Sequence, residues 1–352
     1  MILKELSKLS YLGLLMSMKN LKILSKRYFQ NWPSWHLIYE WEDDFSSILD
    51  IPVINAETKE HIYENTWVRR FFTLTPTRWV AQFVNSVFAS KDKYIAFELT
   101  VKKNFSYSNG INSIPIVVDF FTRDAGSFHA AYKNSTLICI TSLEAFNFLK
   151  DNHCNLNIRH LPLSLSDRYM IDRHTTFTKK YDIILAGRKN KILWDFLLEY
   201  EKKFPDIEYL YQEEINGQLF YSSNKSGILG SFHTRQEYTD LLKQCRIGFY
   251  STAGIDGGEI RTGGFNPVTP RYLELIASGC LLLGRYPDTD ETRSYELQRY
   301  CPNVDSYLEF ETLLSSYLSG SGPDLDAYVS FLKKHYTSNV ALQLKDYVEA
   351  GL

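Results

Sequence analysis

The chain has few cysteines, and no two of them form a Cys-x-x-Cys pair. The five are scattered along its 352 residues, at Cys139, Cys154, Cys245, Cys280 and Cys301. An odd, scattered set of this kind argues against both a disulfide framework and a cysteine zinc site. We therefore predict no metal centre and a reducing, cytoplasmic location.

The chain also lacks an excess of charge of one sign and a long apolar run. Lys and Arg total 39, Asp and Glu total 41, and the net charge is −2. Nucleic-acid-binding domains usually carry a basic excess, so we predict no nucleic-acid partner. No stretch approaches the ~20 apolar residues that a bilayer-spanning helix needs.

The first 28 residues depart from this charge balance. They carry six basic residues against Glu5, namely Lys4, Lys8, Lys19, Lys22, Lys26 and Arg27. One interpretation is a solvated helix or an extended translation start, with Met18 as the true beginning. The other is a basic amphipathic foot that contacts an anionic inner membrane surface. A signal peptide is disfavoured, because no small-residue cleavage site follows the apolar stretch 11–18.

Short apolar runs alternate with helical patterns through both halves of the chain. The expected strands are 94–97, 114–118, 136–140, 157–161, 181–186, 207–211, 246–251 and 280–283. Capping-box patterns at 141–144 and 234–237 predict two helix starts. Such alternation produces crossover units and a parallel sheet. We predict an α/β fold with two Rossmann-like, doubly wound domains facing across a cleft, where ligands sit outside the carboxyl ends of the strands.

The domain boundaries follow from a polar, weakly periodic stretch near the middle of the chain. The predicted segments are a first domain at 1–165, a linker at 166–180, a second domain at 181–322 and a helical tail at 323–352. Packing of the tail against the first domain is one expected position for it.

Glycine is concentrated in one window, 254–284, which holds 7 of the 18 glycines. Glycine allows sharp turns and close approach of a ligand to the backbone. Thr269 is the expected N-cap of a following helix, with Pro270 as its first residue. Amides at a helix start favour an anion such as phosphate, and Arg271 adds a positive charge there. Glu274 follows one turn later, on the same helical face, so the pattern indicates a nucleotide site; the alternative is a plain surface ion pair between these two residues.

A second basic element follows the expected strand 181–186. Gly187, Arg188 and Lys191 form a turn whose two cations can clamp a diphosphate. The alternative is an ordinary basic surface turn. The turn is not a Walker P-loop, because no Gly-Lys-Ser/Thr follows.

The first half offers weaker candidates. Asp119 ends an apolar strand and is either a proton acceptor or a turn carboxylate. His129 is either a site residue or a satisfied loop histidine. The acidic cluster 40–44 is interpreted as a solvated loop rather than a catalytic pair. Aromatic residues near loops either belong to the core or stack on sugar rings; they are Trp32, Trp35, Tyr39 and Trp41.

Residues 265–284 resemble the signature of the group 1 glycosyltransferases of the GT-B fold. In that family a glycine-rich loop precedes a helix with a glutamate and the phrase Ala-x-Gly, which 273–279 matches here. The family glutamate, second of a Glu-x7-Glu pair, binds the nucleotide ribose, and Glu274 matches it. Asn266 stands at the first position of that pair. This departure indicates a divergent subfamily, similar to the transferases of bacterial surface-polysaccharide and O-antigen synthesis.

The resemblance implies a nucleotide-sugar donor and a glycan or lipid-linked glycan acceptor. The donor-site residues that it implies, together with the turn and loop patterns, are Gly187, Arg188, Lys191, Ser251, Gly264, Phe265, Asn266, Thr269, Arg271 and Glu274. It also implies hexosyl or deoxyhexosyl transfer with retention, without metal or cofactor. Arg188 and Lys191 would act on the leaving diphosphate, and Asp119 would be the base in an inverting enzyme. The alternatives are a nucleotide-sugar epimerase of the same architecture and a degenerate module that binds glycan or nucleotide.

Overall fold

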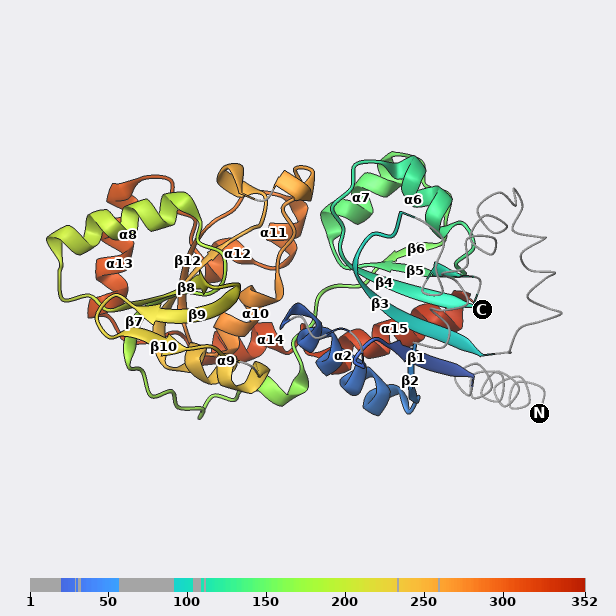
Figure 1. Ribbon diagram of the computed structural model, residues 1–352, viewed down its shortest axis with the longest axis horizontal. Coiled ribbons are helices and arrows are strands. Elements are labelled where there is room, and N and C mark those ends of the chain that lie inside the picture. Colours follow the sequence, from blue (N-terminus) through green and yellow to red (C-terminus); the bar gives the residue numbers. More distant parts are fainter. Residues whose placement is uncertain are drawn as a thin grey trace. The chain divides into compact units, whose positions relative to one another are not determined.

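The computed structural model describes residues 20–28, 30, 33–56, 92–103, 109–110, 112–232, 234–258 and 260–351. They fall into two compact units (Figure 1). The first comprises Met1–Ser166 and Thr337–Leu352, and the second comprises Asp167–Tyr336. The hypotheses on the N-terminal segment up to residue 19 and on Trp32 lie outside the described residues.

The first unit is built on a six-stranded parallel sheet in the order β2-β1-β3-β4-β5-β6. Its strands are β1 Leu21–Ser25, β2 Val53–Asn55, β3 Lys93–Thr100, β4 Ser113–Asp119, β5 Ile138–Ile140 and β6 Ile158–His160. Its helices include α2 Pro33–Leu49, α6 Ala125–Tyr132, α7 Leu143–Asp151 and α15 Thr337–Gly351. Figure 1 shows α6 and α7 on one face of the sheet and α2 and α15 on the other. Because helices cover both faces, strands such as β4 are continuous apolar runs rather than alternating ones.

The second unit also has six strands, in the order β10-β9-β8-β7-β11-β12. They are β7 Tyr181–Leu185, β8 Tyr209–Ile215, β9 Gln218–Ser223, β10 Gly227–Gly230, β11 Cys245–Ser251 and β12 Leu281–Arg285. Strands β8, β7, β11 and β12 run parallel, whereas β9 and β10 continue the sheet antiparallel. The helices are α8 Lys191–Lys203, α9 Arg235–Lys243, α10 Pro270–Ala277, α11 Asp290–Ser294, α12 Leu297–Tyr300, α13 Tyr307–Ser319 and α14 Leu325–Leu332.

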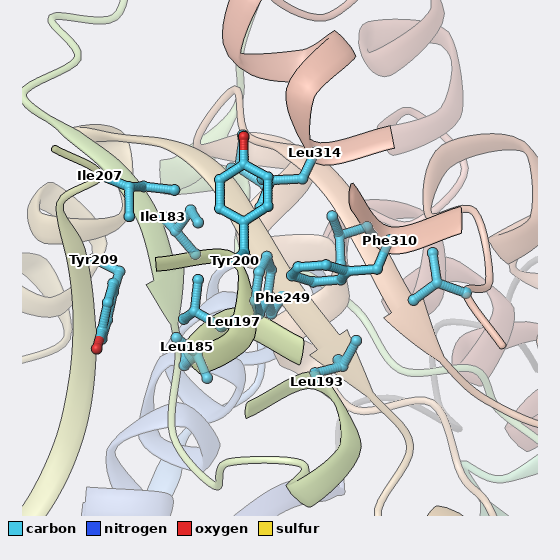
Figure 2. Close-up of a cluster of buried hydrophobic side chains, with 13 residues drawn as sticks. Ile183, Leu185, Leu193, Leu197, Tyr200, Ile207, Tyr209, Phe249, Phe310 and Leu314 are labelled. Carbon is cyan, nitrogen blue, oxygen red and sulfur yellow. The ribbon is translucent and has the colours of Figure 1, made fainter. Parts of the chain in front are cut away.

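The core of the second unit lies between the sheet and helices α8 and α13. Figure 2 shows Leu197 of α8, Phe249 of β11 and Phe310 of α13 gathered in one cluster. Phe310 is fully buried and meets Phe249 edge-on at 5.5 Å between ring centroids. Burial of such side chains contributes about 1.5–3 kcal/mol each, so this cluster fixes the sheet that carries the loops at its edge.

Both sheets confirm the predicted α/β class with two doubly wound units. Three local features differ from what the sequence led us to expect. Ser142, not Thr141, is the N-cap of α7, and its side chain accepts from the amide of Ala145. Residues 216–217 form a tight turn between β8 and β9, with φ values of 52° and 78°, and the sequence analysis missed this Asn-Gly hairpin signal.

The third correction concerns the acidic cluster 40–44, which lies inside helix α2 and not in a solvated loop. Glu40 and Glu42 are buried, with 6% and 1% of their surface exposed. Burial raises the pKa of Glu42 to about 7, although hydrogen bonds from Ser25 and Arg27 oppose that rise. A buried carboxyl requires such partners, and they come from the end of β1.

The predicted domain segments are distributed as follows. Residues 167–180 of the predicted linker lie in the second unit. Residues 323–352 divide between the units, because α14 lies in the second and α15 in the first. Within the first unit, α15 packs against α2.

Candidate functional site

The candidate site lies at the carboxyl edge of the second sheet. The register pairs Phe249 of β11 with Leu185 of β7, and Ser251 of β11 with Arg285 of β12. These three strands are parallel, so the turns that follow them meet at one edge, where α/β sheets bind ligands. The turn after β7, the glycine-rich loop after β11 and the end of β12 are therefore neighbours.

Gly187 begins the turn after β7, and helix α10 comes directly against it. Its φ is +77°, a conformation that side chains rarely adopt. A Cβ atom at Gly187 would lie 2.3 Å from a guanidinium nitrogen of Arg271, the second residue of α10. The left-handed turn favours glycine here, and the absence of a side chain lets the flexible guanidinium of Arg271 approach the backbone.

The cations of the turn occupy different environments. Arg188 and Lys191 are exposed, and Lys191 is the first residue of α8. Asn190 caps that helix, because its Oδ1 accepts from the amide of Leu193 at 3.0 Å. Lys189 instead lies 4.5 Å from the ring centre of Trp194 and turns toward the helix. An exposed cation pair at the start of a capped helix can attract an anion through both charge and dipole.

Thr269 stands at the N-cap of α10, followed by Pro270 as the first helical residue. Its amide donates to the hydroxyl of Tyr250 at 3.0 Å. Its side chain makes no cap hydrogen bond, and its Oγ1 is buried without a hydrogen-bond partner among the described residues. A buried hydroxyl without a partner costs about 1–3 kcal/mol.

Glu274 is buried on α10, with 4% of its surface exposed. Its Oε1 accepts from the guanidinium of Arg235 at 2.5 Å. The partner of Glu274 is thus Arg235, which the sequence pattern does not indicate, and not Arg271 as in the surface-pair alternative. The capping box of Thr234 and Glu237 opens α9 and makes Arg235 its first residue, but it gives no signal for the pair with Glu274.

Two tyrosines lie near Glu274 and Arg271. Tyr221 of β9 is buried, and burial raises its pKa to about 12, although Arg271 and the amide of Gly187 act in the opposite direction. Tyr238 of α9 lies under the guanidinium of Arg235, at 5.4 Å from its ring centre. Both phenols remain protonated at neutral pH and so can donate hydrogen bonds.

The glycine-rich loop is held by polar side chains that the sequence analysis did not select. Arg285, at the end of β12, contacts both carboxylate oxygens of Asp256, at 2.6 and 2.7 Å. Asn190 donates to the same carboxylate at 2.9 Å. Asp256 therefore ties the loop to the turn after β7 and to β12. Asn266 accepts from the hydroxyl of Thr252 at 3.0 Å.

The remaining predicted donor residues lie on this loop or at its start. Ser251 is half-buried at the end of β11, and Gly264 is exposed with a φ of +86°. Phe265 is fully buried, so its ring belongs to the core and its backbone is the part that a ligand could meet. The structure thus brings the predicted donor residues together at one edge of the second unit.

Asp119 belongs to the other unit. It is the last residue of β4 and lies opposite Thr100 of β3 in the register. His129 contacts Asn155 at 2.8 Å, which agrees with a satisfied histidine. Trp41 is buried and donates to the carbonyl of Ser164, so it is a core residue.

Among the described residues, no helix combines the length and apolarity required to cross a bilayer. The described residues likewise contain no group of three or more His, Cys, Asp or Glu side chains arranged to hold a metal ion.

No protein-family model and no curated protein sequence matches the chain. Similar solved structures include the GtfA/B complex, at 12% identity and a TM-score of 0.46 over 78% of this chain. Another is the pneumococcal O-GlcNAc transferase GtfA in complex with UDP and GlcNAc, at 13% identity and 0.44 over 78% of this chain. The chain spans 60% of the length of each of these two. A third, from Listeria monocytogenes, is named as a UDP-N-acetylglucosamine 2-epimerase, at 9% identity and 0.46, and covers 92% of this chain and 94% of that one.

Proposed function

We propose that this protein is a glycosyltransferase that moves a sugar from a nucleoside-diphosphate sugar to a glycan or lipid-linked glycan. The observation that supports it most is the contact of Arg271, at the start of α10, with Gly187 in the turn that carries Arg188. That contact brings together the two elements for which the sequence predicts anion binding. Glu274 lies one helical turn farther on, where a ribose attached to a diphosphate would be expected.

The chemistry needs charge stabilisation more than it needs a strong base. As the bond between sugar and oxygen breaks, negative charge grows on the β-phosphate. Preorganised cations and helix-start amides are effective at such a position. In this proposal Arg188, Lys191 and Arg271 supply them in place of a divalent metal. Transfer proceeds with retention, and Asp119 serves as base only in the inverting alternative.

The acceptor belongs to the proposal at a coarser level. A growing bacterial surface polysaccharide, made at the cytoplasmic face of the membrane, suits a donor that is a cytoplasmic nucleotide sugar. The basic N-terminal segment would then supply a peripheral contact with anionic lipid.

The first test is thermal stabilisation by UDP, GDP, dTDP and CMP. We expect one of the diphosphates to raise the melting temperature, because a ligand that binds only the folded state stabilises it. Arg188→Ala and Glu274→Ala should abolish the rise. Arg246→Gln is the matched control, since Arg246 pairs with Asp182 at the opposite, amino edge of the sheet. A melting temperature that none of the nucleotides changes would contradict the proposal.

The second test uses the matching nucleotide sugar without acceptor. A transferase leaves the sugar configuration unchanged and at most hydrolyses the donor slowly. Conversion to an epimer would assign the protein to the epimerase alternative instead. Nucleotide binding without turnover, even with lipid-linked acceptors, would favour the degenerate module.

A further inference from the structure

We propose that Arg235 is a positioning residue, which fixes the carboxylate of Glu274 toward the ribose hydroxyls of the donor. The inference rests on the proposed function and adds a residue to it. Arg235 lies 39 positions before Glu274 in the chain, and the sequence pattern assigns it no role.

The first argument is the burial of both partners. The side chains of Arg235 and Glu274 are 16% and 5% exposed, and 2.5 Å separates the guanidinium nitrogen from Oε1. A carboxylate so deeply placed needs a hydrogen-bonded partner, and Arg235 supplies it. Only a charged carboxylate, acceptor at both oxygens, can take the two hydroxyls of a ribose.

The second argument is the rigidity of the element that carries Arg235. The capping box of Thr234 and Glu237 is complete in both directions, so the first turn of α9 is fixed. Helix α9 packs on α10, which carries Glu274. The guanidinium of Arg235 also lies over the ring of Tyr238. The ring of Tyr238 and the fixed first turn of α9 therefore restrict the position of the Arg235 side chain beside Glu274.

Arg235 and Arg271 occupy different positions in the site. Among the described residues, Arg235 of α9 pairs with Glu274, and the charge of Glu274 acts on the phenols of Tyr238 of α9 and Tyr221 of β9. Arg271 is committed to the turn at Gly187, where the diphosphate is expected. The two arginines thus have separate tasks: Arg271 faces the phosphates, whereas Arg235 orients the carboxylate.

The test compares ribose and dideoxyribose ligands, because only a ribose role depends on the sugar hydroxyls. Binding of UDP and 2′,3′-dideoxy-UDP, and of GDP and its dideoxy analogue, is measured by calorimetry on the full chain. We expect the wild type to prefer the ribose form by roughly 10-fold to 100-fold, the effect of a hydrogen bond to a charged group. Arg235→Gln and Glu274→Gln should both reduce this ratio toward 1, with binding of the dideoxy form largely kept.

Two further variants keep the experiment decisive. Arg235→Lys retains the charge but not the planar fork, and it should retain part of the preference for ribose. It takes the place of Arg235→Gln in the test if that variant does not fold. Arg246→Gln removes one arginine from an ion pair of the same unit and should leave the ratio at the wild-type value.

The outcomes separate the two proposals. If Arg235→Gln weakens ribose and dideoxyribose ligands equally and keeps the ratio, Arg235 is merely structural and the inference fails alone. A wild type that binds both forms equally refutes the ribose role of Glu274, and the inference with it. A wild type that binds no nucleotide overturns the proposed function itself.

Discussion

Gly187 shows how much of this site depends on the absence of a single Cβ atom. Its left-handed backbone lets the chain turn sharply after β7, and its missing side chain admits the guanidinium of Arg271. Gly217 has nearly the same φ, +78°, but nothing lies within 4 Å of its missing Cβ. The two positions therefore separate backbone strain from close approach.

We predict that Gly187→Ala loses nucleotide binding, whereas Gly217→Ala does not. Both variants should lose about 1 kcal/mol of folding free energy to strain. Gly187→Ala should in addition displace Arg271 from the turn, because the new methyl group would occupy its place. Denaturant unfolding gives the first quantity and a nucleotide titration the second. Equal nucleotide affinity in the two variants would show that the approach of Arg271 is unimportant.

Asp256 and Asp305 share one arginine but differ in burial. The hydrogen bonds from Arg285 and Asn190 hold the pKa of Asp256 below its ordinary value of 3.8. Its side chain is 9% exposed, whereas that of Asp305 is 72% exposed. The folded state therefore favours the charged form of Asp256. The resulting stabilisation is complete above about pH 5 and is lost as the pH falls through 3.8 and below.

We predict that Asp256→Asn destabilises the second unit by about 2–3 kcal/mol at pH 7, because Arg285 loses its buried carboxylate. Asp305→Asn should cost no more than about 0.5 kcal/mol. Urea unfolding at pH 7 and pH 3 measures both. The difference between wild type and Asp256→Asn should shrink at pH 3, and an undiminished difference there would argue against the ion pair as its cause.

At the scale of elements, local signals identified the starts of α9 and α10 and most strands. The capping box at Thr234 and the first-turn proline of α10 are decided by neighbouring residues, so the sequence shows them. The apolar run of β4 is likewise visible, because it is buried on both faces. Helix α2 was not predicted over residues 40–44, because a cluster of acidic residues usually indicates a solvent-exposed segment. The partners that allow Glu42 to be buried, at and just after the end of β1, are not visible in the sequence.

The difference between local signals and tertiary contacts also explains which site residues the sequence did not indicate. The glycine window, Arg271 and Glu274 are contiguous in the chain and were found together. The pairs that fix them join residues far apart, 39 positions for Arg235 and Glu274 and 29 for Asp256 and Arg285. Periodicity and spacing carry no information on such pairs, because tertiary packing alone brings the partners together.

At the scale of the whole molecule, repetition of the strand–helix alternation was sufficient to predict two α/β units. The first unit is discontinuous. The sequence predicted that the tail 323–352 could pack against the first domain, but not the residue at which the chain returns. The chain leaves that unit after Ser166 and re-enters it at Thr337, whose amide donates to the carbonyl of Leu165 at 2.9 Å. Helix α15 then packs on α2.

We predict that removal of residues 337–352 unfolds the first unit and leaves the second folded. The deletion withdraws four buried apolar side chains from the first unit, namely Val340, Ala341, Leu344 and Val348. Their loss costs several kcal/mol. Limited proteolysis with mass spectrometry should recover a resistant fragment near 167–336. Removal of 350–352 alone is the control, and resistance of the first unit in the longer deletion would refute the prediction.

The return of the chain at Thr337 also sets an order of events during synthesis. Every residue of the second unit leaves the ribosome before α15 does, so that unit can complete its folding while the first still lacks a helix. The first unit lacks α15 until the second unit has been synthesised. During that time the surface of α2 that α15 covers stays exposed. On a translating ribosome the second unit would therefore finish folding before the first.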